Sequence, residues 1–312
     1  MRGDRIMSWL SRLWPWGRPP APQTGTRAPA SDATPVRIEP VQEPAAPVAD
    51  VRPVLPWLLG CGELSDTPIT PIERQALDAV ARTLALPEIP DNLLPRAAAL
   101  IPQLIALVRQ TDLPTPAIAE RIGKDAVLAA EVMRLASSPY YRVQGDVNDL
   151  EQAISLIGLQ GLQTVIARVL LKPIYQSPPG PLSGRAGPRM WDHSEALARH
   201  TGILATPTGQ SVFDGYLAGM LHDTGWTIAF SIIDRSGIQL PVPPSQAFGA
   251  ALTEQMHRLF GLAAQRWEIT PGFSALAKDA RRNGLVAATH PLAKVLQQAQ
   301  QAALDELEAE QA

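Results

Sequence analysis

The chain has 312 residues, of which 46% are hydrophobic and 18% charged, and its formal net charge is −3. This length is enough for one large domain or two ordinary ones with a buried core. The slightly negative charge excludes a general nucleic-acid binder, because such proteins need a positive surface field. No apolar run reaches the roughly 18 residues that a membrane-spanning helix requires, so we expect no transmembrane segment. The single cysteine, Cys61, cannot form an internal disulfide, so packing must hold the fold together.

Proline is concentrated at the N-terminus, where 11 of the 31 prolines lie within residues 1–60. Because proline disfavours helices and cannot donate a hydrogen bond to a sheet, we expect residues 1–60 to form a disordered tail. Residues 1–17 differ, since Trp9, Trp14 and Trp16 lie among aliphatic residues and arginines. If helical, this segment is a short amphipathic anchor for a membrane surface or a partner's groove. The alternative is a frayed tail.

From residue 71 onward, apolar residues recur with helical spacing and no convincing alternating strand is found. Helices are expected over residues 71–84, 93–108 and 116–122, followed by one that Asp125 caps and that extends to residue 136. Asp149 and Gln152 resemble a capping box, which predicts a helix over residues 150–157. Gly158 is expected to end that helix in a left-handed conformation, before a further helix over residues 162–170.

A Pro- and Gly-rich stretch over residues 177–188 is interpreted as a loop between two helical blocks. In the second block we expect helices over residues 190–203, 211–223, 247–267, 273–282 and 291–310. The predicted fold class is therefore all-α. The predicted organisation is a tail (1–60), a helical extension (61–88), a bilobed helical domain (89–290, with lobes at about 89–176 and 189–290) and a C-terminal helix (291–312).

Two histidine motifs carry the chemistry that this sequence offers. One is Trp191-Asp192-His193-Ser194 within an expected helix, and the other is Leu221-His222-Asp223-Thr224-Gly225, where Gly225 is expected to break a helix. Adjacent helical side chains project about 100° apart, so His222 and Asp223 converge only on something at the helix end. A divalent metal that His193 also binds would fit that position. In the alternative, His222 bonds a backbone carbonyl and Asp223 caps or bridges two helices.

Four groups of residues, in order along the chain, resemble the motifs of the HDOD family, the HD-related output domains of the HD superfamily. Together they cover about residues 90–290. The first group runs from a helix start at Asp125 to Ser137-Ser138 and Tyr140, and the second is a turn from Ala153-Ile154 to Gly158-Leu159. The third consists of the His193 and His222-Asp223 motifs, and the fourth of His257, Gly261 and Trp267. The resemblance implies a bilobed, HDOD-like or HD-like helical bundle. It also implies a role in bacterial signal transduction and a cytoplasmic location.

The chain departs from the family pattern where catalytic HD proteins hold a metal or phosphate. Thr224 and Trp226 replace the usual Ile and Lys, and residues 296–299 contain no carboxylate where catalytic relatives are expected to carry an aspartate. The resemblance therefore assigns His193, His222 and Asp223 to an incomplete metal site and assigns no catalytic residue. No cofactor is expected, and a divalent metal would find only this partial set of ligands.

Two functions follow from the resemblance. The first, which we expect, is a non-catalytic signalling module that binds a partner protein of unknown identity or a small regulator. The second is a residual metal-dependent phosphohydrolase that acts on a nucleotide or cyclic dinucleotide through the incomplete metal site. Four further residues are candidates for binding, and a plain packing role is the alternative for each of them: Tyr140, Tyr141, Trp191 and His257.

Overall fold

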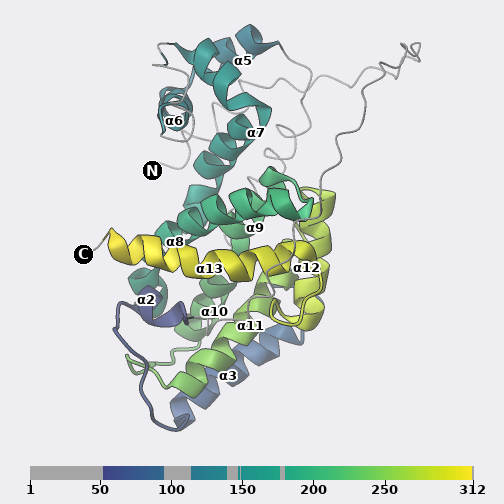
Figure 1. Cartoon of the computed structure of the whole chain (residues 1–312). Coiled ribbons are helices and arrows are strands. Elements are labelled where there is room, and N and C mark those ends of the chain that lie inside the picture. Colours follow the sequence, from purple (N-terminus) through teal and green to yellow (C-terminus); the bar gives the residue numbers. More distant parts are fainter. Residues whose placement is uncertain (1–51, 95–113, 139–146, 148, 176–179, 311–312) are drawn as a thin grey trace. The chain divides into compact units, whose positions relative to one another are not determined.

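The computed structural model describes residues 52–94, 114–138, 147, 149–175 and 180–310. The helices in this part of the chain (Figure 1) are α2 (Leu55–Leu59), α3 (Pro71–Leu84), α5 (Thr115–Ile122), α6 (Ala126–Ala136), α7 (Leu150–Leu171), α8 (Pro181–Ala205), α9 (Val212–His222), α10 (Thr224–Arg235), α11 (Gln246–Ala264), α12 (Pro271–Asn283) and α13 (Pro291–Ala309). Short 3₁₀ turns follow α7 (Lys172–Ile174) and α8 (Thr206–Thr208). The described residues form no strand, which confirms the all-α class. Predictions for residues 1–51, for most of 93–108, and for Tyr140 and Tyr141 lie outside the described residues.

Several helices begin where the local sequence signals predict. Asp125 caps α6 by accepting the backbone N–H of Leu128 at 2.7 Å, and Asp149 caps α7 by accepting that of Gln152 at 2.8 Å. Each carboxylate satisfies one of the backbone donors that a helix N-terminus leaves unpaired. These starts are therefore determined by neighbouring residues in the chain, which explains why the sequence alone predicts them.

Gly158 interrupts α7, as the sequence predicts. Its φ of 65° and ψ of −174° are not helical, so Leu150–Leu171 consists of two helical stretches joined at a kink. Glycine adopts a positive φ without the steric penalty that a side chain would bring. The expected helices over residues 150–157 and 162–170 are thus both present.

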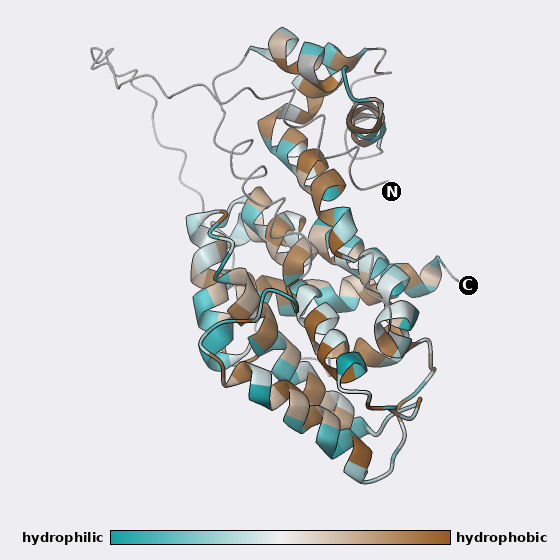
Figure 2. Ribbon diagram, turned by 180° about the vertical axis from the view of Figure 1, so that it is seen from behind, coloured by the Kyte–Doolittle hydropathy of each residue, from teal (hydrophilic) through white to brown (hydrophobic). Residues whose placement is uncertain are grey.

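The segment Leu150–Ile174 is also long and apolar enough, by length and composition, to cross a membrane, with a mean hydropathy of 1.6. Figure 2 shows this helix as largely hydrophobic. Half of its most apolar window is buried against the rest of the described structure, and the core helix of a globular protein has the same property. The expectation of no membrane-spanning helix therefore remains an expectation for this chain.

Three elements differ from the sequence predictions. Helix α8 begins at Pro181, so most of the expected loop at 177–188 is helical, and Pro188 lies inside the helix. The N-terminus of α8 has no cap from its own side chains. Instead, the carboxylate of Asp234 in α10 accepts the backbone N–H groups of Leu182 (3.0 Å) and Ser183 (2.9 Å). A cap supplied from 50 residues further along the chain leaves no local signal.

The second difference is at Gly225, which does not end a helix but lies in the first turn of α10. A Cβ at this position would overlap the backbone carbonyl of Met256, so the glycine allows α10 and α11 to approach closely. The third difference is α2, whose residues fall inside the predicted tail. Leu55 and Leu58 have no exposed surface, and α2 packs against α8, so tertiary contacts hold this short helix despite its prolines.

The core lies around α8 and α11. Helix α8 packs against α9, α10 and α13, and α11 packs against α3, α10 and α12. Five large aromatic side chains are almost completely buried there: Trp226, Phe230, Phe248, Phe260 and Phe273. Trp267 is also buried, with 3% of its surface exposed.

A buried carboxylate joins α3 to the start of α11. Glu73 of α3 completes a capping box by accepting the Thr70 N–H at 2.7 Å, and it also accepts the Ser245 N–H at 2.6 Å and the Ser245 hydroxyl at 3.1 Å. Ser245 in turn caps α11. Burial opposes ionisation of Glu73, but these hydrogen bonds outweigh it and hold its pKa below the usual value. One side chain therefore organises the starts of two helices.

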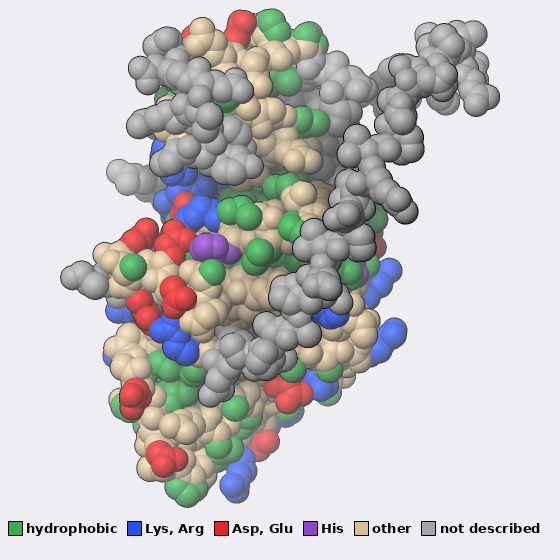
Figure 3. Space-filling model, viewed as in Figure 1, with side chains coloured by type: hydrophobic (Ala, Val, Ile, Leu, Met, Phe, Trp, Pro, Cys, Tyr) green, Lys and Arg blue, Asp and Glu red, His purple; other side chains and the backbone are tan. Residues whose placement is uncertain are grey.

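Charged side chains gather near the C-terminal end of α13, where acidic residues dominate (Figure 3). Arg52 forms ion pairs with Glu308 (2.7 Å) and with Asp305. His200 of α8, which is partly exposed, contacts Glu306 at 2.8 Å. Arg52 and α8 are thus both tied to the last helix.

Candidate functional site

The three predicted metal-ligand residues meet in the core. His193 lies on α8, His222 is the last residue of α9, and Asp223 lies between α9 and α10. The side chains of His193 and Asp223 have no exposed surface, and that of His222 has 2%. The structure thus brings the three predicted residues together in the core. Ser194 joins them, and we call His193, Ser194, His222 and Asp223 the His–Asp cluster.

Asp223 is the centre of this cluster and both of its carboxylate oxygens are used. Oδ2 accepts from His193 Nδ1 at 2.6 Å and from the Ser194 hydroxyl at 3.0 Å, and Oδ1 accepts from His222 Nδ1 at 2.8 Å. Because an ionised carboxylate only accepts hydrogen bonds, each histidine must carry its proton on Nδ1. Ser194 is a member that sequence reasoning gave no role of its own, although it lies within the first histidine motif.

The junction between α9 and α10 places the Asp223 carboxylate toward α8. The backbone at Asp223 is still right-handed (φ −74°, ψ 0°), so α10 starts at once. The hydroxyl of Thr224 donates to the carbonyl of Leu221 at 2.6 Å, and the Thr227 N–H donates to the carbonyl of Asp223 at 3.0 Å. The turn is therefore fully hydrogen-bonded, as a buried turn must be.

The charge state of the cluster follows from its contacts. Burial alone would favour a neutral Asp223, but electrostatic attraction and hydrogen bonds from His193 and His222 outweigh it and hold the pKa of Asp223 well below its usual range. His257 of α11 packs against His222 with ring centroids 5.5 Å apart. Burial, helped by the neighbouring His222, lowers the pKa of His257 to about 3. His257 is therefore a neutral packing residue at neutral pH.

Aromatic side chains cover the cluster on several sides. Trp57 of α2 lies 6.2 Å from His193 between ring centroids, and Phe260 lies 5.9 Å from His222. Trp57 was not predicted, because its segment was assigned to the tail. Three polar ring atoms here are buried and have no hydrogen-bond partner among the described residues, namely Trp57 Nε1, His193 Nε2 and His257 Nδ1. Helix α2 thus closes a cluster formed by α8 and α9.

The donor set does not fit a divalent metal. The carboxylate that would bind the ion already accepts from three side chains, and both histidines turn Nδ1 toward it. In the part of the chain that the structure describes, no group of three or more His, Cys, Asp or Glu residues could hold a metal ion. Leu296, in the stretch 296–299 where catalytic relatives are expected to carry an aspartate, is buried on α13 with 2% of its surface exposed. The arrangement satisfies polar groups within the core and leaves no set of free oxygen ligands.

Trp191, another of the predicted binding residues, does not lie at the cluster. Trp191 lies half-buried on α8, where its ring is 6.1 Å from that of Tyr175 and has the ammonium group of Lys172 above it at 5.3 Å. Tyr175 connects this surface with the core, since its hydroxyl donates to the carbonyl of Met220 at 2.5 Å. Of the two predicted binding residues that the structure describes, His257 lies at the cluster and Trp191 lies elsewhere, whereas Tyr140 and Tyr141 lie outside the described residues.

Comparison with known proteins agrees with this fold. The model of the HDOD domain matches residues 94–273, which is more than half of the chain. The chain belongs to the HDOD domain family. Helices α2, α3 and α13 lie outside the matched residues, yet they pack against the HDOD domain through α8, α10 and α11. Trp57, which covers His193, therefore comes from a segment beyond the match.

The relatives of this HDOD domain are distant. An "Uncharacterized protein" of Treponema pallidum (strain Nichols) is 23% identical over 194 residues, which are 59% of this chain and 35% of that protein. The chain thus spans about a third of the length of this curated relative. The structure of a "Putative metal-dependent phosphohydrolase" from Shewanella amazonensis SB2B has a TM-score of 0.54 at 16% identity and covers 77% of this chain and 90% of its own. That of an HDOD domain protein with unknown function from Geobacter sulfurreducens has a TM-score of 0.42 at 19% identity and covers 76% and 94%. The first of these two structural likenesses shows the fold alone.

Proposed function

We propose that this HDOD protein is a non-catalytic module of bacterial signal transduction that binds a partner protein or a small regulator. The observation that carries the proposal is the use of Asp223, whose two oxygens accept from His193, His222 and Ser194 within the core. A metal-activated water needs an open ligand position and access to substrate. The His–Asp cluster offers neither, because its side chains are buried and bonded to one another.

The segment that precedes the matched domain supports the same function. Trp57 packs over His193, and the neighbouring leucines of α2 are fully buried. Helix α2 would have to leave its place before a substrate could approach His193 from that side. The buried cluster then has a structural task, which is to join α8 to the α9–α10 junction beneath an outer surface that is free to bind a regulator or partner.

The second candidate is a residual metal-dependent phosphohydrolase acting on a nucleotide or cyclic dinucleotide. One observation favours it: His193 Nε2 has no hydrogen-bond partner among the described residues, so its lone pair is free to bind an ion. The similar structure from Shewanella amazonensis SB2B is that of a "Putative metal-dependent phosphohydrolase". The two buried, unpartnered histidine nitrogens among the described residues, His193 Nε2 and His257 Nδ1, fall short of the three protein ligands that catalytic zinc sites use.

Activity and binding measurements on the same preparation separate the two candidates. The purified chain is incubated with bis(4-nitrophenyl) phosphate and with a cyclic dinucleotide in the presence of Mn²⁺ or Fe²⁺. We expect no hydrolysis above the buffer rate. Hydrolysis that His222→Ala abolishes would support the phosphohydrolase and contradict the proposal.

The partner is sought by affinity capture from the native host, with the full chain and with a chain lacking residues 1–50. We expect one captured protein that also binds the purified chain stoichiometrically in a calorimetric titration. Capture of nothing by either chain, together with metal-dependent hydrolysis, would overturn the proposed function.

A further inference from the structure

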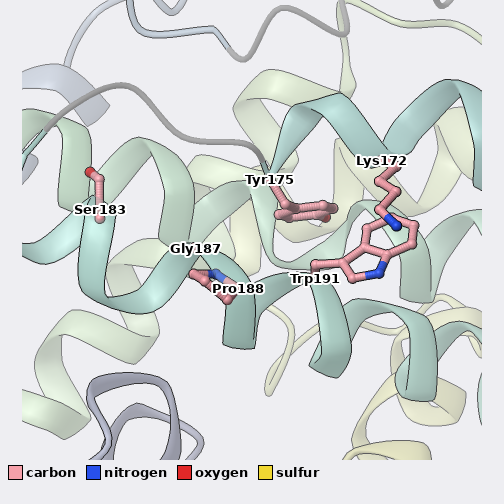
Figure 4. Close-up of a pocket in the computed structure, with 7 residues that line it drawn as sticks. Lys172, Tyr175, Ser183, Gly187, Pro188 and Trp191 are labelled. Atoms are coloured by element: carbon pink, nitrogen blue, oxygen red, sulfur yellow. The ribbon is translucent and has the colours of Figure 1, made fainter.

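A pocket lies apart from the His–Asp cluster, between the end of α7 and the first turns of α8. Its volume is about 360 Å³, and its described lining consists of Lys172, Tyr175, Ser183, Gly184, Gly187, Pro188 and Trp191. Figure 4 shows Lys172 reaching toward Trp191 at one end, Tyr175 and Pro188 between, and Ser183 at the other end. The volume falls within the range of about 300 to 1,000 Å³ in which proteins hold small molecules.

One end of the pocket is suited to a flat ring. Trp191 is half-buried, its ring is tilted by 52° to that of Tyr175, and the two centroids are 6.1 Å apart. Tyr175 is only 2% exposed and its hydroxyl is bonded to Met220, so it contributes its ring and not a polar group. Such tilted aromatic walls favour stacked or edge-on contacts with an aromatic ligand.

The same end carries a positive charge. Lys172 Nζ lies 5.3 Å above the Trp191 ring, and no ion pair of Lys172 is found within the described residues. Lys172 is also the only charged residue in the described lining. The N-terminus of α8 does not add to this charge, because the carboxylate of Asp234 already accepts its free N–H groups. An acidic group on a ligand would therefore meet Lys172.

The other end offers a polar contact and open space. Ser183 has 1% of its surface exposed, and its hydroxyl has no hydrogen-bond partner in the described part of the chain. A buried polar group without a partner costs free energy, which a ligand atom bonded to it would recover. Next to it, a Cβ added at Gly184 would meet no atom within 4 Å.

From these observations we propose that the pocket binds a small planar aromatic acid, with its ring against Trp191, its acidic group at Lys172 and a polar atom within reach of Ser183. The proposal names the class of small regulator in the proposed function and rests on it to that extent. It is independent of the partner protein and of the metal chemistry.

The test compares two probes that differ in charge, 2-naphthoate and its neutral amide 2-naphthamide, by calorimetric titration of the full chain. We expect 2-naphthoate to bind more tightly than the amide. Lys172→Met keeps the aliphatic stem and should weaken 2-naphthoate about 5-fold, as for the loss of one partly exposed ion pair, while leaving the amide unchanged. Lys294→Met, on the exposed side of α13, is the matched control and should change neither.

A second variant tests whether binding needs the open volume beside Gly184. Gly184→Leu places a side chain in the open volume and should abolish binding of both probes, with an unchanged circular dichroism spectrum showing that the variant folds. If this variant does not fold, Lys172→Met decides alone, because Lys172 is exposed and its loss leaves the core intact. No binding of 2-naphthoate, equal effects of the two lysine variants, or normal binding by folded Gly184→Leu would overturn the pocket proposal. None of these results would alter the outcome of the hydrolysis and capture experiments.

Discussion

Replacing Asp223 by alanine tests whether the His–Asp cluster is a structural element. The substitution removes the acceptor for three buried donors, on His193, His222 and Ser194, with donor–acceptor distances of 2.6, 2.8 and 3.0 Å. A hydrogen bond to a charged group contributes about 1.5 to 3 kcal/mol, so three such bonds bound the loss at roughly 4 to 9 kcal/mol. Ring tautomers and water entering the vacated space recover part of it, so we expect a loss of about 4 to 6 kcal/mol.

Urea unfolding followed by far-ultraviolet circular dichroism, with and without EDTA, measures this loss. Since whole domains are stable by about 5 to 15 kcal/mol, the midpoint of Asp223→Ala should fall sharply, and EDTA should change neither protein. Asp305→Ala is the matched control, because that carboxylate is 62% exposed and pairs only at the surface. If Asp223→Ala does not fold, Ser194→Ala should still lose about 1.5 kcal/mol, the lower value for one hydrogen bond to a charged group. A wild-type midpoint in Asp223→Ala, or an EDTA effect on the wild type that the variant lacks, would refute the reasoning.

Three further predictions concern contacts that hold helices together. Glu73→Gln should lower the free energy of unfolding by about 2 kcal/mol at pH 7. The folded state lowers the pKa of Glu73, so its contribution to stability is complete above the unfolded pKa of about 4.3. That contribution is lost as the pH falls through the folded pKa. Urea midpoints should therefore differ at pH 7 and converge below about pH 4, and a constant difference would contradict this account. Gly225→Ala should cost about 2 to 3 kcal/mol by overlap with the carbonyl of Met256, and an unchanged thermal midpoint would show that α10 and α11 are not in close contact. Asp234→Ala removes the cap of α8 and should cost about 1 to 2 kcal/mol in the same assay, whereas Asp305→Ala should not.

Sequence reasoning identified those elements whose signals are local. Asp125 and Asp149 cap helices that begin within three residues of them, and Gly158 interrupts a helix through its own backbone angles. It was wrong about residues 181–188, where Pro188 and two glycines indicated a loop. Asp234 caps that helix from another element, and packing against α9 and α13 stabilises it, so the deciding contacts lie far away in the chain.

In the candidate site, too, local sequence signals named the residues but not the contacts that depend on helix packing. The two histidine motifs pointed to His193, His222 and Asp223, and the family resemblance assigned the same three residues to a metal site. The sequence could not show that Asp223 is shared by three donors, because that depends on how α8 lies against the α9–α10 junction. Nor could it place Trp57 over His193. The proline-rich composition around α2 predicts no helix there, and only tertiary packing stabilises this short helix.

The segments on either side of the matched residues contact the domain. Arg52, Trp57 and Glu73 precede the residues that the HDOD model matches, and each contacts a different element. Trp57 covers the cluster, Glu73 caps the start of α11 through Ser245, and Arg52 pairs with the C-terminal end of α13. The matched HDOD residues and their flanking helices therefore form one compact unit, from residue 51 onward.

The central claim is that His193, His222 and Asp223 serve the core and do not hold a metal. The most direct measurement is elemental analysis of the full chain, produced in medium supplemented with manganese, iron and zinc and purified without chelators, beside His222→Ala prepared in the same way. The account predicts substoichiometric metal in both proteins, with no difference between them. Stoichiometric manganese, iron or zinc in the wild type that is lost in His222→Ala would contradict it.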